Sequence, residues 1–284
     1  AAAARRLVLK AVRVRGTELR FLERGAGIPV VFVHGSLGTF DTWRQQVDTF
    51  ARHFRVITYS RRSHPPNPAP AGSQPYSLAL HAEDLIAFVE TLGLERVHLV
   101  GTSYGAFVAL RVTVDRPDLV RSLVLAEPPI LPWLGRTPEG DSLRRAFEAA
   151  ALVPARRAFA RGDSTDALRR FVDGVMGQSG WFDGRPAEMR AALLRLALEF
   201  SLEMRADPAV YLPALDCPDV GRIRNSVLLV TGQRSARMFH IITDELARCL
   251  RNEDMATVPG AGHAMHADQP AYYNAVVLRF LLRN

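Results

Sequence analysis

The sequence is most constrained by a turn that joins a short apolar strand to an alanine-rich helix. The strand is expected over 97–100, and Gly101-Thr102-Ser103-Tyr104-Gly105 follows it. So sharp a reversal strains the central residue, and glycine at 101 and 105 lets the helix pass close to the strand. Gly-x-Ser-x-Gly occurs by chance in many chains, but here both flanking elements can be read. We therefore expect the Ser103 hydroxyl at the C-terminal edge of a sheet, with the Tyr104 N–H pointing toward any developing oxyanion.

Strand-like and helix-like segments alternate on both sides of this turn. Two antiparallel strands are expected at 7–15 and 18–23, followed by strands at 29–33, 54–59, 97–100, 120–125, 226–231 and 255–258. Helices are expected at 41–52, after Ser77, after Ser103, at 238–251 and from Pro270. Alternation with short links predicts an α/β fold with a mostly parallel, doubly wound sheet that helices cover on both faces.

The pattern changes between the strands at 120–125 and 226–231. This part of the chain contains helical periodicity but no strand-like run, with helices expected at 142–161, 164–176 and 186–205. The sequence therefore predicts a helical cap at 129–222, inserted into a core that is formed by 1–128 and 223–284.

Composition excludes several classes of partner. The formal charge of +7 comes from arginines interspersed with acidic residues, and Lys10 is the only lysine. Because no basic run is longer than a pair, nucleic-acid binding is not indicated. The sequence contains no run of about 18 apolar residues, so it predicts no membrane span. We expect a small apolar molecule as the partner, with neither nucleic acid nor membrane, and we leave a homodimer open.

Two observations bear on the cellular compartment. Cys217 and Cys249 are too few and too widely spaced to indicate a metal site or a disulfide framework, so a reducing, cytoplasmic location is the default expectation. The first residues lack the apolar core of a signal peptide, because Lys10 and Arg13 interrupt the apolar residues there. The sequence does not begin with Met, and a signal peptide already removed would leave no trace.

A nucleophilic serine needs a base, and the base needs an acid that orients it. His263 lies in a glycine-rich turn after the last strand, where a loop can bring an imidazole toward Ser103. His266 is nearer the final helix and is expected to be a supporting or surface residue. Without carboxylate or cysteine companions, the two histidines do not predict a metal site.

With these residues the chain resembles the α/β-hydrolase family over nearly its whole length. The shared motifs are His34-Gly35-x-x-Gly38, the Gly101-x-Ser103-x-Gly105 turn, Gly262-His263 and a helical cap after the sixth strand. The resemblance implies that the Ser36 N–H is a second oxyanion donor beside the Tyr104 N–H. The glycine beside Ser36 supports this role, since it lets backbone amides approach a ligand.

The acid departs from the common family pattern. Many members carry an aspartate in Gly-x-x-Asp after the seventh strand, but this chain has Gly232-Gln233-Arg234-Ser235. Other members place the acid at the end of the sixth strand, where Glu127 stands here before two prolines. We therefore expect Glu127 to orient His263. Asp216, Asp219 and Asp244 remain alternatives for the acid. In that case Glu127 would cap a helix end or anchor the cap.

The sequence departs from the family pattern a second time, after the strand at 54–59. The family segment Asp-x-Arg-Gly-x-Gly is replaced by Ser60-Arg61-Arg62-Ser63-His64-Pro65, and the proline-rich loop continues to Pro75. This loop either shapes the entrance of the site or is a rigid surface excursion. We favour the surface excursion, because loops more often vary than act.

The cap is rich in large apolar residues. Most are expected to pack the cap, and a few to line an apolar pocket over Ser103. The pocket residues that we expect are His34, Leu37, Trp133, Trp181 and Phe182. An apolar pocket favours a hydrophobic or aromatic ester, lactone or thioester over a sugar or phosphate. Residue 103 is a serine and not an aspartate. This argues against the chemistry of haloalkane dehalogenases and epoxide hydrolases, family members in which an enzyme carboxylate is alkylated.

The sequence thus predicts a serine hydrolase of small hydrophobic carboxylic esters or lactones that works through an acyl-enzyme and implies no cofactor. A thioesterase or a hydrolase of carbon-carbon bonds would use the same three residues, so both remain alternatives. A ligand-binding protein with a vestigial triad is a third. Its support is the missing aspartate after the seventh strand.

Overall fold

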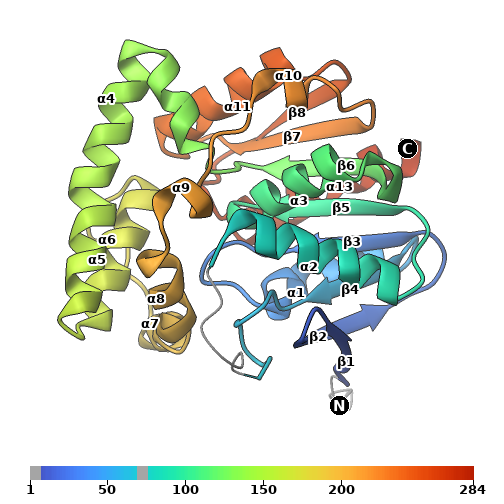
Figure 1. The fold of residues 1–284 in the computed structure, drawn as a ribbon, viewed down its shortest axis with the longest axis horizontal. Helices are drawn as coiled ribbons and strands as arrows, with labels where there is room; N and C mark the ends of the chain where they lie inside the picture. The colour runs from blue at the N-terminus through green and yellow to red at the C-terminus, as the bar shows by residue number, and fades with distance from the viewer. Residues whose placement is uncertain (1–7, 69–75) are drawn as a thin grey trace.

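One eight-stranded sheet organises the computed structural model, which describes residues 8–68 and 76–284 (Figure 1). The strand order is β1-β2-β4-β3-β5-β6-β7-β8. The pairs β1–β2 and β2–β4 are antiparallel, and all other neighbours are parallel. The strands are β1 (Lys10–Val14), β2 (Thr17–Arg24), β3 (Pro29–Val33), β4 (Arg55–Tyr59), β5 (Val97–Thr102), β6 (Val120–Ala126), β7 (Ser226–Gly232) and β8 (Glu253–Val258). The predicted α/β fold, with its antiparallel beginning, is confirmed.

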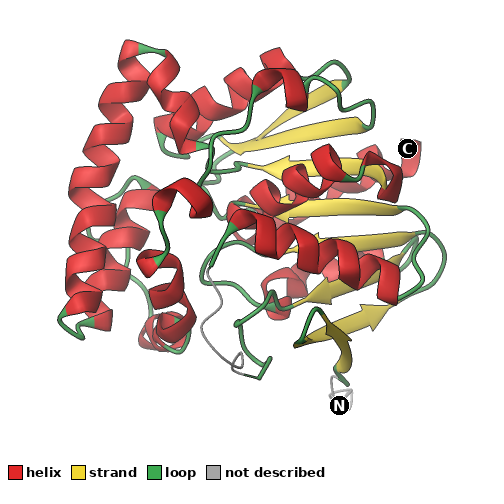
Figure 2. Ribbon diagram, in the orientation of Figure 1, coloured by secondary structure: helices red, strands yellow, loops and turns green. Residues whose placement is uncertain are grey.

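Helices cover both faces of the sheet (Figure 2). Residues of α2 (Leu78–Thr91), α3 (Tyr104–Asp115) and α11 (Arg237–Cys249) share one apolar cluster with Val31 and Val33 of β3. Residues of α1 (Arg44–Phe50) and α13 (Pro270–Arg283) share the other cluster with Val30 and Phe32. Because successive strand residues point to opposite faces, a continuous apolar strand supplies both clusters at once. The helix expected at 41–52 is a 3-10 turn, η1 (Phe40–Trp43), followed by α1.

The first residues of the loop after β4 are buried, so the expected surface excursion is wrong for residues 60–64, whereas Pro66 and Pro68 are exposed. Arg61, Arg62 and His64 are all buried. Two nitrogens of Arg62 donate to the carboxylate of Asp84 in α2, both at 2.6 Å. Such pairing lets a guanidinium lie inside the protein. Residues 69–75 of this loop lie outside the described residues.

The chain between β6 and β7 is helical in all its regular elements. It forms η3 (Leu131–Arg136), α4 (Pro138–Phe147), the π-helical turn η4 (Glu148–Leu152), α5 (Val153–Ala160), α6 (Ser164–Met176), α7 (Ala187–Leu194), α8 (Ala197–Arg205), α9 (Pro208–Tyr211) and α10 (Cys217–Val220). Most of these helices stand beside the sheet in Figure 1, at the left of the view. We keep the name cap for residues 129–222. Among the described residues, no helix has the length and apolarity needed to cross a membrane.

The expectation that Cys217 and Cys249 fit no disulfide framework is wrong. Cys217 at the start of α10 and Cys249 at the end of α11 form a disulfide, with Cα atoms 5.2 Å apart. The bridge closes a loop of 32 residues that contains β7. Sequence spacing alone did not indicate the pair, because the two helix ends meet only once α11 packs on the sheet. The argument for a reducing compartment, which rested on the lack of a disulfide pattern, therefore loses its basis.

We expect this disulfide to stabilise the fold. Cross-linking a loop of this length restricts the unfolded chain and contributes about 3–4 kcal/mol in the chain-entropy model. Urea unfolding with and without dithiothreitol measures the contribution. The double variant Cys217→Ala/Cys249→Ala is the control and should show no response to the reductant. Equal unfolding midpoints for oxidised and reduced wild-type chain would contradict the assignment.

Candidate active site

Ser103 occupies a strained turn between β5 and α3. Its backbone has φ 52° and ψ −127°, and its N–H donates to the Ala126 carbonyl at 2.7 Å. A side chain on Gly101 would come within 2.6 Å of the Ala106 Cα, and one on Gly105 would overlap the carbonyl oxygens of Val33 and His34. The two glycines therefore let α3 lie against β3 and β5, as the motif predicts.

A glutamate and a histidine meet beside this turn. Glu127 directly follows β6, and His263 lies between β8 and α12 (Met265–Asp268). The His263 Nδ1 is 2.5 Å from Glu127 Oε2, and the Gly232 N–H donates to Glu127 Oε1 at 2.8 Å. The His263 ring also stacks on Phe239, with ring centroids 4.1 Å apart. The imidazole is therefore held by a buried carboxylate on one edge and by an aromatic face.

This contact fixes which ring nitrogen can act as the base. A carboxylate accepts a hydrogen bond from Nδ1–H, which leaves Nε2 of a neutral imidazole as the acceptor. The His263 Nε2 is buried and has no hydrogen-bond partner among the described residues. It belongs to a residue that lines the same cavity as Ser103. The arrangement fits a base facing a serine.

The alternative acids do not hydrogen-bond to His263 in the described part of the chain. Asp219 instead pairs with Arg222 at 2.7 Å. The motif position expected to carry an aspartate after β7 is Ser235, and the contribution of this strand to the site is the N–H of its last residue, Gly232, which donates to Glu127. His266 also lines the cavity, and burial, followed by the charge of His263, lowers its pKa to about 4.

Two backbone amides lie at the same edge of the sheet. Ser36 follows β3, and Tyr104 is the first residue of α3. Neither N–H donates a hydrogen bond to another described residue. A side chain on Gly35 would come within 2.9 Å of the Ser103 Cβ, so glycine is what lets this loop approach the serine. Both amides are therefore available to a negatively charged oxygen that forms beside Ser103.

A cavity of about 380 Å³ lies between the sheet edge and the cap. The sheet side contributes Ser36, Leu37, Ser103 and His263. The cap side is apolar and is formed by Phe171, Val172, Val175, Met176, Trp181, Met189, Ala192, Leu193 and Leu196. Asp41 and Arg44, whose charged groups are 3.7 Å apart, also line it.

Three expected pocket residues lie elsewhere, and two line the cavity. Leu37 and Trp181 belong to its lining, whereas His34, Trp133 and Phe182 do not. Trp133 is buried with its indole N–H donating to the Leu215 carbonyl at 2.6 Å, and Phe182 packs in the core. His34 lies at the start of the loop that carries Gly35 and Ser36, where the Arg61 backbone N–H donates to its Nε2 at 2.9 Å. The lining residues of α7 were missed, because helical periodicity does not tell which cap helix faces Ser103.

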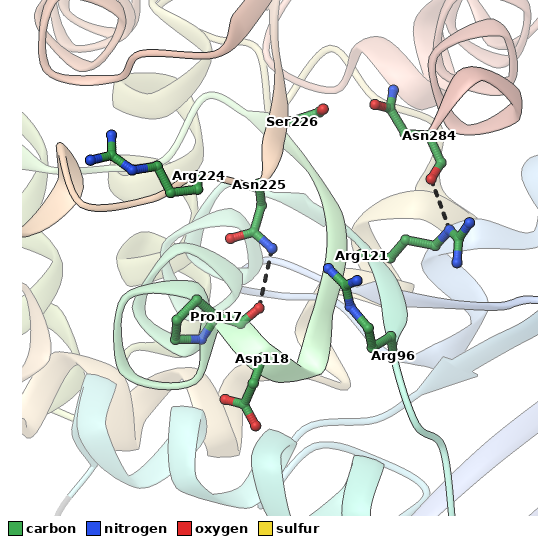
Figure 3. Close-up of a pocket in the computed structure, with 8 residues that line it drawn as sticks. All are labelled: Arg96, Pro117, Asp118, Arg121, Arg224, Asn225, Ser226 and Asn284. Atoms are coloured by element: carbon green, nitrogen blue, oxygen red, sulfur yellow. Dashed lines mark hydrogen bonds between the residues drawn. The ribbon is translucent and has the colours of Figure 1, made fainter.

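Figure 3 shows a second cavity, of about 510 Å³, at the opposite edge of the sheet. Apart from Asn284 at the end of the sequence, its lining comes from residues just before or at the start of β5, β6 and β7 and includes Arg96, Arg121 and Arg224. Arg96 donates to the Val120 carbonyl at 3.1 Å, and Arg121 to the Asn284 carbonyl at 2.8 Å. The lining contains no histidine or cysteine, so its one serine, Ser226, has no base there. Across residues 8–68 and 76–284, no cluster of three or more His, Cys, Asp or Glu could hold a metal ion.

Comparison with known proteins decides the family. The model described as "Alpha/beta hydrolase family" matches residues 30–276. The chain belongs to this family. It is 24% identical over 258 residues to a putative esterase/lipase of Haemophilus influenzae, across 90% of this chain and 83% of the relative. It is 27% identical over 260 residues to the putative carbamate hydrolase RutD of a Caulobacter species, across 87% of each.

A solved structure shares the fold of this alpha/beta hydrolase. It is that of Est816, described as an N-acyl homoserine lactone degrading enzyme. The TM-score is 0.75 at 23% identity, and the match covers 95% of this chain and 100% of Est816. At this identity the likeness shows the fold. The names of the two sequence relatives support hydrolase activity.

We expect Gly105→Ala to destabilise the fold. Its methyl group would meet backbone carbonyls that cannot move without shifting β3, at a cost of about 2–3 kcal/mol. Gly135→Ala is the matched control, because a side chain there meets nothing within 4 Å. Urea unfolding of both variants measures the difference. Equal stability of the two would mean that α3 does not lie as close to β3 as described.

Proposed function

We propose that this chain is a serine hydrolase that cleaves small apolar carboxylic esters or lactones through an acyl-enzyme. The observation that carries the proposal is the buried contact between His263 Nδ1 and Glu127 Oε2, which leaves His263 Nε2 unpartnered beside the cavity that Ser103 lines. Serine, histidine and a carboxylate in these relations form the activating chain of a serine hydrolase.

In the proposed mechanism Ser103 Oγ attacks the substrate carbonyl while His263 Nε2 accepts the hydroxyl proton. Glu127 stabilises the imidazolium that forms, and the N–H groups of Ser36 and Tyr104 donate to the tetrahedral oxyanion. The intermediate collapses to an acyl-serine, and His263 returns the proton to the leaving alkoxide. Water then attacks the acyl-serine with His263 again as the base, which releases the acid and restores Ser103. A lactone follows the same steps, its alcohol remaining attached to the acid. This mechanism needs no cofactor.

The cavity supports the proposed substrate class. Aromatic and aliphatic cap residues such as Phe171, Met176 and Trp181 face the side that carries Ser103, and the charged Asp41 and Arg44 pair with each other. An apolar wall excludes water and strengthens hydrogen bonds to the oxyanion. The volume of about 380 Å³ suits a small ester or lactone. The fold shared with a lactone-degrading enzyme is consistent with this class.

Turnover of p-nitrophenyl butyrate tests the proposal. Ser103→Ala should abolish turnover, because it removes the nucleophile. Glu127→Gln should lower kcat about 10³–10⁴-fold, since an amide cannot stabilise the imidazolium. The matched control is Glu139→Gln, whose carboxylate pairs with Arg237 on the surface and should not affect kcat.

The outcomes separate the roles of these residues. Turnover that survives Ser103→Ala would overturn the serine mechanism. If Glu127→Gln keeps the wild-type kcat, Glu127 does not orient the base. Thermal unfolding of each variant shows whether the fold is retained, so that a lost rate is assigned to chemistry.

A further inference from the structure

Arg61 is buried directly behind the proposed oxyanion loop, where its guanidinium binds two consecutive carbonyl groups. Its Nε donates to the His34 carbonyl and its Nη2 to the Gly35 carbonyl, both at 3.1 Å. Its side chain is 1% exposed. A guanidinium has five N–H donors in a fixed fork, so it can hold both carbonyls in one orientation.

The Gly35 carbonyl and the Ser36 N–H belong to the same peptide group. Because a trans peptide is planar, fixing the carbonyl on one side fixes the N–H on the other. The Gly35 oxygen is held twice, by Arg61 and by His34 Nδ1 at 2.8 Å. Burial, followed by the charge of Arg61, lowers the pKa of His34 well below its usual value, so His34 is neutral. With its Nε2 accepting from the Arg61 N–H, its Nδ1 carries the proton and donates to Gly35.

The cap supplies the counter-charge. Glu203 of α8 is fully buried, and its Oε1 is 3.5 Å from Arg61 Nη2. The same Oε1 accepts from the Tyr76 hydroxyl at 2.7 Å, and Oε2 accepts from the Tyr211 hydroxyl at 2.8 Å. Tyr76 also accepts from Arg61 Nη1 at 2.9 Å, so it bridges the two charges. Tyr211 in turn lies 3.4 Å from the Ser36 hydroxyl.

These contacts make the cap part of the oxyanion loop's support. Apolar residues can fill such a site with equal or greater stability, because two buried charges lose their hydration. A fully buried ion pair that joins α8 to the peptide of Ser36 therefore calls for a role beyond stability. Holding the amide in advance is one, since a preorganised donor need not reorient during the reaction.

We propose that Glu203 is a positioning residue that couples the seating of the cap to the orientation of the Ser36 N–H. Through Arg61 it keeps the Gly35–Ser36 peptide aimed at the oxyanion, so the oxyanion site is complete only when α8 is docked. This inference rests on the proposed function, in which the Ser36 N–H stabilises the tetrahedral intermediate.

Glu199 provides a matched control on the same helix. It is buried one turn before Glu203, and its Oε1 is 3.4 Å from His64 Nδ1. Burial, with a further contribution from the charge of Glu203, raises the pKa of Glu199 to about 8. Its carboxyl is therefore mostly protonated at neutral pH, and a glutamine is a close substitute. Within the described residues it does not hydrogen-bond to Arg61.

The test compares Glu203→Gln with Glu199→Gln at pH 7. The substrate is p-nitrophenyl butyrate, and an alkyl trifluoromethyl ketone serves as an analogue of the tetrahedral intermediate. We expect Glu203→Gln to lower kcat by about 10–100-fold, less than the 10²–10³-fold loss from deleting an oxyanion donor. KM should stay within about twofold, and Ki for the ketone should rise by the same factor as kcat/KM falls. Glu199→Gln should match the wild type.

Tyr76→Phe is a second, uncharged variant. It removes the hydroxyl that bridges Arg61 and Glu203, so it should shift kcat and Ki in the same direction by a smaller factor. Thermal unfolding shows whether Glu203→Gln folds. If it does not, Tyr76→Phe is the variant that tests the role of Glu203 and Arg61. An unchanged kcat and Ki in Tyr76→Phe would then overturn the inference.

Two results would count against the inference in different ways. If the wild-type chain hydrolyses the ester but Glu203→Gln matches it in kcat and Ki, or changes only KM and melting temperature, Glu203 has a structural role alone. If the wild-type chain neither hydrolyses the ester nor binds the ketone, the proposed function fails and this inference fails with it.

Discussion

The structure around the candidate site depends on one buried carboxylate, that of Glu127. A buried charge is costly unless it is paired and hydrogen-bonded, and Glu127 meets this requirement through His263 and the Gly232 N–H. Glu127 and these two partners lie at or after the ends of three neighbouring strands, β6, β7 and β8. Because the buried carboxylate must be hydrogen-bonded, it holds the ends of these three strands in fixed positions relative to one another. It also fixes the imidazole edge that faces the cavity.

Sequence analysis could predict those parts of the site that depend on residues close together in the sequence. Gly101, Ser103 and Gly105 lie within one turn, and their spacing already contains the steric requirement that the structure shows. Glu127 could be placed because parallel strands bring their C-terminal ends to one edge, so a carboxylate just after β6 lies within reach of a loop after β8. Strand periodicity likewise predicted the sheet, since apolar runs buried on both faces leave few alternatives.

Other features depend on packing between distant segments, which local sequence does not determine. Trp133 and Phe182 are as apolar as Trp181, but only the docked cap shows that Trp181 faces the cavity. Arg61 and His64 looked like solvated loop residues because their partners are carbonyl groups after β3 and carboxylates of α8, far away in sequence. The Cys217–Cys249 bridge was missed for the same reason. Positions 61 and 203 now connect the cap with the loop that carries Ser36.

Covalent labelling with a fluorophosphonate tests the central claim most directly, because the reagent reacts with a serine only when a base activates it and an oxyanion site receives the phosphonyl oxygen. Intact mass followed by peptide mapping gives both the stoichiometry and the modified residue. The account predicts one adduct per chain, on Ser103, absent in Ser103→Ala and formed much more slowly in Glu127→Gln. A native chain that takes up no adduct, or takes it up on another residue, would contradict the assignment of Ser103, His263 and Glu127 as the reacting group.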